Sequence, residues 1–149
     1  MKDVFEHIDG QVDARLEELF DWLRIPSVSA DPAHFPDCRR AADWLADRLR
    51  SAGMSEVELI ETGGQPAVFA AWTGAPDKPT VLFYGHYDVQ PAVKEDGWKT
   101  EPFEPERHGD VLLGRGTADD KGQVHAHVAA VASLLEVRGS LPCNVKFIV

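Results

Sequence analysis

A histidine and an aspartate two residues apart follow a run of apolar residues. Residues 81–85 (VLFYG) have the composition of a strand, and His86 and Asp88 come directly after it. In an extended segment residues i and i+2 point to the same side, so these two side chains can converge while Tyr87 faces away. A metal-binding imidazole usually donates its other ring N–H to a carboxylate or carbonyl. On this tripeptide alone, the plainer interpretation of a buried histidine beside a helix-capping aspartate is the more frequent one.

A second cluster strengthens the metal interpretation. Residues 114–122 (GRGTADDKG) follow a short apolar run and precede an expected helix. One of the two carboxylates, Asp119 or Asp120, can face the site while the other caps the helix or faces solvent. A carboxylate at such a turn can bridge two divalent ions roughly 3.5–4 Å apart. The alternatives are a plain capped turn and a phosphate loop; the latter fits poorly, because Asp119 replaces the last glycine of G-x-G-x-x-G.

The elements that must position these clusters alternate between helical and extended patterns. Apolar spacing predicts helices over residues 11–24, from about 36 to a cap at Gly53, and over 122–137. Strands are predicted at residues 57–61, 67–72, 80–84, 111–113 and 144–149, with a long loop over 90–110. The continuous apolar runs at 67–72 and 80–84 are typical of strands covered on both faces, and the turns between the first three strands favour antiparallel neighbours. The expected class is α/β, a mixed sheet sandwiched by helices.

Composition excludes several classes of protein. The 149 residues are 44% hydrophobic and 27% charged, with a formal net charge of −10. This balance is typical of a soluble globular domain, and acidity argues against a nucleic-acid partner. No stretch approaches the roughly 20 apolar residues of a membrane helix, and the acidic N-terminus lacks a signal-peptide pattern. We therefore expect a cytoplasmic protein with no membrane partner, and reduced thiols at Cys38 and Cys143.

Taken together, the two clusters resemble those of the M20 metallopeptidases. The resemblance is carried by residues 84–91 (YGHYDVQP), 97–103 (GWKTEPF) and 114–122, in that order. The VQP extension and residues 98–103 are most similar to the dipeptidase branch, which includes carnosinase-type enzymes. Residues 25–29 (IPSVS) also match the N-terminal loop of that family. The resemblance covers nearly the whole chain.

The resemblance implies a zinc-exopeptidase-like catalytic domain with two divalent metal ions. By position, His86 would ligate one metal, Asp119 would bridge both, and Asp88 would be the supporting catalytic aspartate. It also implies a cis peptide bond between Asp119 and Asp120. Zinc is the usual metal, with manganese or cobalt as alternatives, and the reaction is attack of a bridging water on the amide of a small peptide.

In that family a general-base glutamate, further metal ligands and a lid and dimerisation domain follow the position of Val149. We therefore expect residues 1–149 to be the N-terminal portion of the catalytic domain, truncated at its C-terminal side and inactive alone. The full-length form is expected to be a homodimeric dipeptidase. One alternative is an N-acyl-amino-acid deacylase of the same family; another, from a different class, is a non-catalytic binding domain that retains the fold.

Other polar residues near the clusters receive plainer interpretations. His125 and His127 lie two apart on a helix and point in different directions, so we expect them to be satisfied or exposed and not ligands. Arg115 either holds the site carboxylates or lies on the surface. Trp98 is expected to anchor the long loop, and Lys121 to pair with nearby acids at the helix start.

Overall fold

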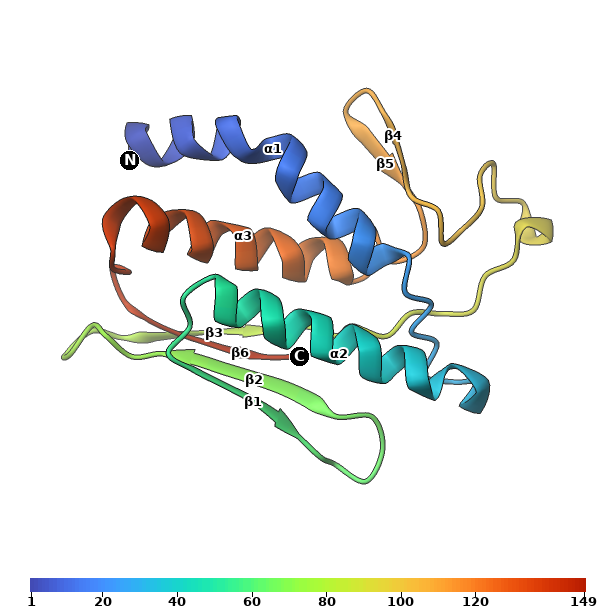
Figure 1. Cartoon of the computed structure of the whole chain (residues 1–149), viewed down its shortest axis with the longest axis horizontal. Helices are drawn as coiled ribbons and strands as arrows, with labels where there is room; N and C mark the ends of the chain where they lie inside the picture. Colours follow the sequence, from blue (N-terminus) through green and yellow to red (C-terminus); the bar gives the residue numbers. More distant parts are fainter.

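Three helices lie on one side of a mixed sheet in the computed structural model, which describes residues 1–149 (Figure 1). The helices are α1 (Lys2–Leu23), α2 (Phe35–Ser51) and α3 (Lys121–Arg138). The sheet strands are β1 (Glu56–Ile60), β2 (Ala67–Trp72), β3 (Thr80–Tyr84) and β6 (Asn144–Ile148). Helix α2 lies on β1 and β2, α3 reaches β3, and α1 packs along α3. The expected α/β class with a mixed sheet is confirmed.

Strand β6 occupies a central position that the local sequence does not reveal. The sheet order is β1-β2-β6-β3, with β6 antiparallel to β2 and parallel to β3. Strands β1 and β2 are antiparallel neighbours as expected. The prediction that β2 and β3 are neighbours is wrong, because the crossover through α3 returns the chain between them and parallel to β3. Val145 and Phe147 of β6 are buried under the helices there.

Burial on β3 also differs from expectation. Phe83 faces α3, where its ring lies 4.4 Å from that of His127. Leu82 and Tyr84, which point to the opposite face, are 59% and 82% exposed. The prediction that this strand is covered on both faces is therefore wrong within residues 1–149, because the helices cover one face only.

Helix α1 begins nine residues earlier than the predicted start. Val4 extends the apolar stripe toward the N-terminus and is buried, 2% exposed. Gly10 does not end the helix, since one interior glycine costs only about 1 kcal/mol and packing along α3 outweighs it. The other helix ends agree closely with prediction, including a left-handed Gly139 after α3.

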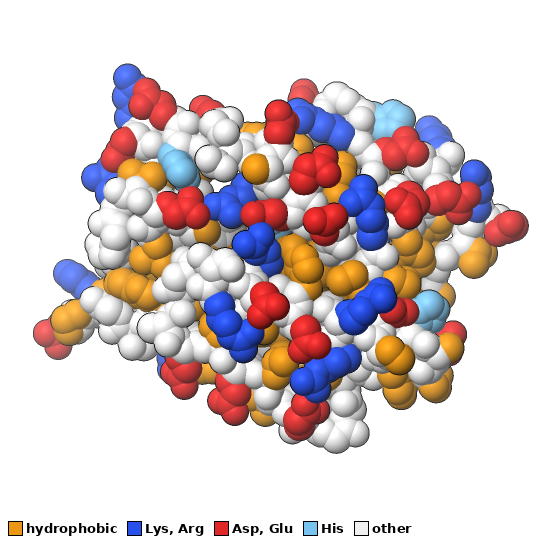
Figure 2. All heavy atoms as spheres, in the orientation of Figure 1, with side chains coloured by type: hydrophobic (Ala, Val, Ile, Leu, Met, Phe, Trp, Pro, Cys, Tyr) orange, Lys and Arg blue, Asp and Glu red, His pale blue; other side chains and the backbone are white.

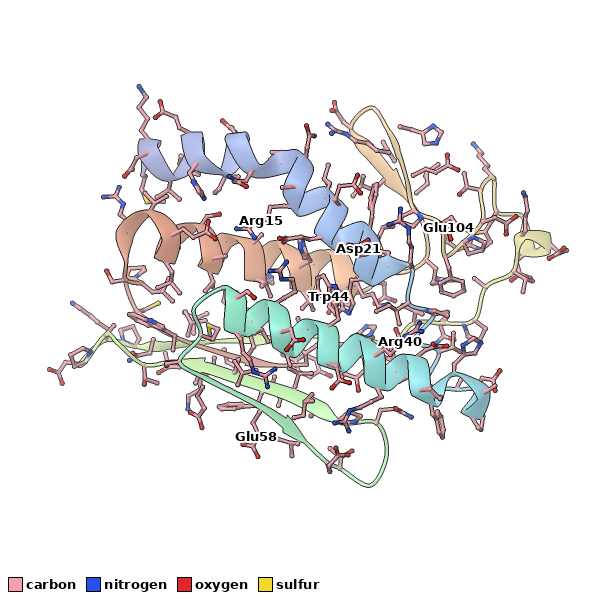
Figure 3. The ribbon with its side chains drawn as sticks, in the orientation of Figure 1. Arg15, Asp21, Arg40, Trp44, Glu58 and Glu104 are labelled. Carbon is pink, nitrogen blue, oxygen red and sulfur yellow. The ribbon has the colours of Figure 1, made fainter.

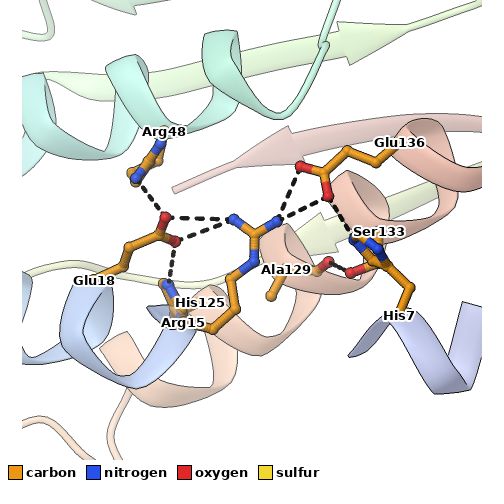
Figure 4. Close-up of polar contacts among 8 residues, drawn as sticks. All are labelled: His7, Arg15, Glu18, Arg48, His125, Ala129, Ser133 and Glu136. Atoms are coloured by element: carbon orange, nitrogen blue, oxygen red, sulfur yellow. Dashed lines mark hydrogen bonds and ion pairs between the residues drawn. The ribbon is translucent and has the colours of Figure 1, made fainter. Parts of the chain in front are cut away.

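Aromatic rings and charged side chains join the three helices. The side chain of Trp44, on α2, points toward α3 (Figure 3). Its ring stacks on that of Trp22 of α1, with 5.0 Å between the ring centroids. Glu18 of α1 pairs with Arg48 of α2 at 2.8 Å and lies 3.6 Å from His125 of α3 (Figure 4). His125 is thus a packed interhelical residue, as expected, and burial lowers its pKa. These contacts lie between the helices and away from the turns that carry the two clusters.

The predicted long loop contains a hairpin. Strand β4 (Glu106–His108) pairs with β5 (Val111–Leu113) across a turn in which Gly109 has a φ of 63°. Strand β5 is confirmed at its predicted residues, whereas the three polar residues of β4 give no apolar run or period by which to detect it in the sequence. Short 3-10 helices at Pro32–His34 and Lys94–Asp96 complete the elements.

The surface over the helices carries both signs of charge. Figure 2 shows Lys and Arg side chains interleaved with Asp and Glu on this face. None of the helices has the length and apolar character required to cross a bilayer. Cys38 is buried and Cys143 partly buried, and both are free thiols.

Two helical glycines provide a matched test of this packing. A Cβ on Gly122 would lie 2.0 Å from the backbone oxygen of Thr117, whereas one on Gly10 would meet nothing within 4 Å. Gly122→Ala should lower the free energy of unfolding by about 2 kcal/mol or more. Gly10→Ala should raise it by about 0.5–1 kcal/mol, because it removes unfolded-state entropy. Urea unfolding followed by circular dichroism measures both; equal effects would contradict the packing described.

Candidate metal centre

The two clusters meet where β3 ends and α3 begins. The Nε2 atom of His86 lies 2.9 Å from Oδ1 of Asp119. On the other side of the ring, Nδ1 lies 3.0 Å from Oδ1 of Asp88 and 3.1 Å from its carbonyl oxygen. The convergence of His86 and Asp88, expected from strand periodicity, is confirmed. The imidazole therefore stands between two carboxylates that come from different turns.

The spacing of His86 and Asp119 is compatible with a shared cation. Zinc lies about 2.0–2.2 Å from such nitrogen and oxygen ligands, which at a tetrahedral angle places the two about 3.3–3.6 Å apart. The observed 2.9 Å requires only a small widening. No group of three or more His, Cys, Asp or Glu side chains is gathered closely enough to hold an ion. The residues present thus fit a metal as a partial ligand set.

The electrostatics of the imidazole follow from its neighbours. Burial lowers the pKa of His86, but hydrogen bonding to the Asp88 backbone and to the Asp119 carboxylate outweighs it, and the pKa is raised above 6.5. These partners therefore stabilise the fold at acidic pH, and the contribution is lost as the pH rises through the raised pKa. Either ring nitrogen can carry the proton of the neutral form; a proton on Nδ1, facing Asp88, leaves the Nε2 lone pair for a cation.

The turns approach closely because Gly85 has no side chain. A Cβ at this position would lie 2.6 Å from Oδ2 of Asp120 and 2.5 Å from Cγ2 of Val124. Oδ2 of Asp120 accepts the backbone N–H of His86 at 3.2 Å. Asp120 makes no side-chain bond to cap its own helix, so the expectation that it caps α3 or faces solvent is wrong. The peptide bond between Asp119 and Asp120 is cis, as the resemblance implies.

Residues 25–29, which we call the positioning segment, hold the turn that contains Asp88. The Ser27 hydroxyl donates to the carbonyl oxygen of Tyr87 at 2.6 Å, and the backbone N–H of Val89 donates to the backbone oxygen of Ser27 at 2.9 Å. The Ser29 hydroxyl donates to Oδ2 of Asp88. Tyr87 is buried and faces away from the site, as expected, and burial raises the pKa of its hydroxyl. No role for Ser27 and Ser29 was predicted from the sequence, although their period-2 spacing places both on one side of an extended segment.

Lys121 does not pair with acids, contrary to prediction. Its side chain is fully buried, and Nζ donates to the backbone oxygens of Trp22 at 2.9 Å and Ile25 at 2.7 Å. Burial lowers the pKa of Lys121 to about 7. A lysine at a helix start looks like a surface residue in the sequence, and its partners are 96 or more positions away.

Arg115 and Trp98 pair with each other. The guanidinium lies 5.1 Å from the Trp98 ring centroid, a cation–π contact. No ion pair joins Arg115 to Asp88, Asp119 or Asp120, so it does not hold the site carboxylates. Trp98 contributes to anchoring the loop, as expected.

A hollow of about 310 Å³ lies next to the imidazole. Its lining includes Ser29, His86 and Asp88 together with the exposed Tyr84. A larger hollow of about 410 Å³, mainly apolar, lies between α1 and α3 and includes none of the metal-centre residues. The smaller one is therefore the space in which a ligand can reach the site.

Known proteins share this chain's sequence and fold over most of its length. Residues 82–149 match the model of peptidase family M20/M25/M40. The chain is 36% identical to Cys-Gly metallodipeptidase DUG1 of Candida albicans over 97% of its length, and 38% identical to mouse Beta-Ala-His dipeptidase over 99%. The crystal structure of human carnosine dipeptidase 1 superposes with a TM-score of 0.91 at 35% identity, covering 99% of this chain and 33% of the other. The chain spans about a third of the length of these relatives.

The position of Asp88 gives a prediction for the metal-free chain. Asp88→Asn removes the negative charge at Nδ1 and keeps a side chain of similar shape, so the pKa of His86 should fall below that of the wild type. NMR titration of the His86 ring in the presence of a chelator measures this. Asp47→Asn, on the exposed surface of α2, should leave it unchanged. Equal His86 pKa values in the wild type and Asp88→Asn would refute the assigned contact.

Proposed function

Since this chain belongs to peptidase family M20/M25/M40, we propose that it forms the N-terminal part of the catalytic domain of a metal-dependent dipeptidase. The observation that carries the proposal is the 2.9 Å approach of His86 Nε2 to Asp119 Oδ1. An imidazole and a carboxylate in this relation are ligands suited to zinc, and the names of relatives similar over almost the whole chain are those of dipeptidases.

We propose that two divalent ions bind, with His86 on one and Asp119 between them. Oδ1 of Asp119 faces the imidazole, while Oδ2 takes part in no hydrogen bond and the side chain is 78% exposed. The second oxygen is thus open to another cation. Zinc is the proposed metal, with manganese or cobalt as alternatives, because imidazole and carboxylate accept all three.

The chain's own residues prepare the imidazole and orient the site. When bound, two such ions supply a water whose pKa is lowered to about 7 and which can attack a peptide carbonyl. Asp88 accepts from Nδ1 and thereby selects the tautomer that presents the Nε2 lone pair. We propose that the hollow beside His86 receives one end of the substrate.

We propose that the remaining ligands and the general base come from a longer protein. Two protein ligands are fewer than the three that catalytic zinc sites hold. The exposed sheet face with Leu82 and Tyr84 is suited to being covered by further chain. Residues 1–149 alone should therefore show no peptidase activity.

Dipeptide hydrolysis by the full-length protein tests the proposal. In the presence of zinc, manganese or cobalt, the protein should cleave the dipeptides Cys-Gly and β-Ala-His in preference to N-acetyl amino acids. A chelator should abolish this turnover. His86→Ala and Asp119→Ala should each lower kcat/KM by more than about 100-fold, because a direct ligand contributes at least as much as its supporting partners. Asp47→Ala serves as the surface control.

Three results would count against the assignment. Cleavage of N-acetyl amino acids in place of dipeptides would identify a deacylase. A full-length protein that binds these compounds without turnover would identify a binding domain. Turnover of dipeptides by pure residues 1–149 would contradict the proposed need for further residues.

A further inference from the structure

We propose that the positioning segment, residues 25–29, fixes both turns of the metal centre, acting on Asp88 through Ser29 and on the Asp119 turn through Lys121. The inference rests on the proposed function in taking His86 and Asp119 as metal ligands. Ser29 and Lys121 touch neither of these two side chains in the structure, so both are positioning residues and not catalytic ones.

The first connection is a row of four polar groups. The Ser29 hydroxyl donates to Oδ2 of Asp88, Oδ1 of Asp88 faces Nδ1 of His86, and Nε2 of His86 faces Asp119. The Asp88 side chain is 39% exposed, so burial alone does not fix the orientation of its carboxylate. Ser29 engages the oxygen that the imidazole leaves free and thereby holds the other oxygen toward Nδ1. Loss of this hydroxyl should let the carboxylate rotate and the imidazole with it.

The second connection runs through the interior to the other turn. Lys121 follows Asp119 by two residues, and its ammonium reaches two backbone oxygens, of Trp22 at the end of α1 and of Ile25 in the positioning segment. The last carbonyls of a helix lack intrahelical partners, and the buried Lys121 amine donates to one of them. The lysine stem passes close to Gly116, where an added Cβ would lie 3.6 Å from Cδ of Lys121. The start of α3 is therefore held at a set distance from residues 22–25.

The helices do not depend on Lys121 for their association. Glu18 of α1 pairs with Arg48 of α2 and lies near His125 of α3. In a second contact between the helices, Arg15 of α1 pairs with Glu136 of α3 at 3.0 Å (Figure 4). These ion pairs lie away from the Asp119 turn. Lys121 contributes the polar connection at the metal-centre end. Its removal should displace the turn more than it separates the helices.

Two variants with matched controls test the proposal. Ser29→Ala and Lys121→Met remove the two connections, and Ser133→Ala and Lys146→Met remove the same groups elsewhere. The Ser133 hydroxyl bonds within α3, and Lys146 lies over Phe69 on the sheet. Ser29→Thr retains the hydroxyl and should restore the wild-type behaviour. If Lys121→Met fails to fold, Lys121→Gln, which is uncharged and too short by one bond to place its nitrogen where the lysine Nζ lies, replaces it.

The first readout needs neither metal nor activity. In the 149-residue chain kept free of metal by a chelator, ¹⁵N NMR of the His86 ring should show a different tautomer balance in Ser29→Ala than in the wild type. Backbone amide shifts of residues 117–120 should change in the Lys121 variant. The controls should match the wild type at both places. Unchanged signals in the folded variants would overturn the proposal, whatever the outcome of the peptidase assays.

The second readout is zinc affinity of the full-length protein, measured by competition with a chelator. Ser29→Ala and the Lys121 variant should each weaken zinc binding by about 10–100-fold, as loss of groups that orient metal ligands does. Affinity within twofold of the wild type in both would contradict the inference. A wild-type protein that binds no zinc would defeat the proposed function instead, and the ring NMR would still decide the positioning role.

Discussion

The close approach of His86 to Asp119 is the constraint on which the rest of the candidate metal centre depends. The two residues are 33 positions apart and come from the end of β3 and the start of α3. Their 2.9 Å contact requires the turns to approach closely, which Gly85 permits by lacking a side chain, while Gly122 lets the second turn fold tightly against Thr117. The parallel pairing of β3 with β6 through α3 fixes the direction from which the second turn arrives.

Around this contact the chain uses two kinds of interaction for two purposes. Partly buried ion pairs and stacked rings hold α1, α2 and α3 together along their lengths. At the end with the candidate metal centre, Ser27 and the buried Lys121 donate to backbone oxygens, and Ser29 donates to the Asp88 carboxylate. Such bonds define position more narrowly than long flexible ion pairs, because the acceptors are fixed by the fold. The site turns are thus set by the backbone of residues 22–29.

Local sequence was sufficient for features that depend on local periodicity. It predicted most helix ends, the extents of β1, β2 and β3, and the convergence of His86 with Asp88. The place of Asp119 came from family resemblance, since no local pattern relates it to His86. The central position of β6, the open face of β3 and the burial of Lys121 were missed. Each depends on partners far along the chain, with 99 positions separating Lys121 from the Trp22 oxygen.

Anomalous X-ray scattering from zinc in crystals of the full-length protein tests the shared site of His86 and Asp119 most directly. We expect one ion about 2.0–2.2 Å from both Nε2 of His86 and an oxygen of Asp119. A second ion should lie roughly 3.5–4 Å from the first, on the other oxygen of Asp119. Zinc bound elsewhere, or bound while His86 points away from Asp119, would contradict the central claim.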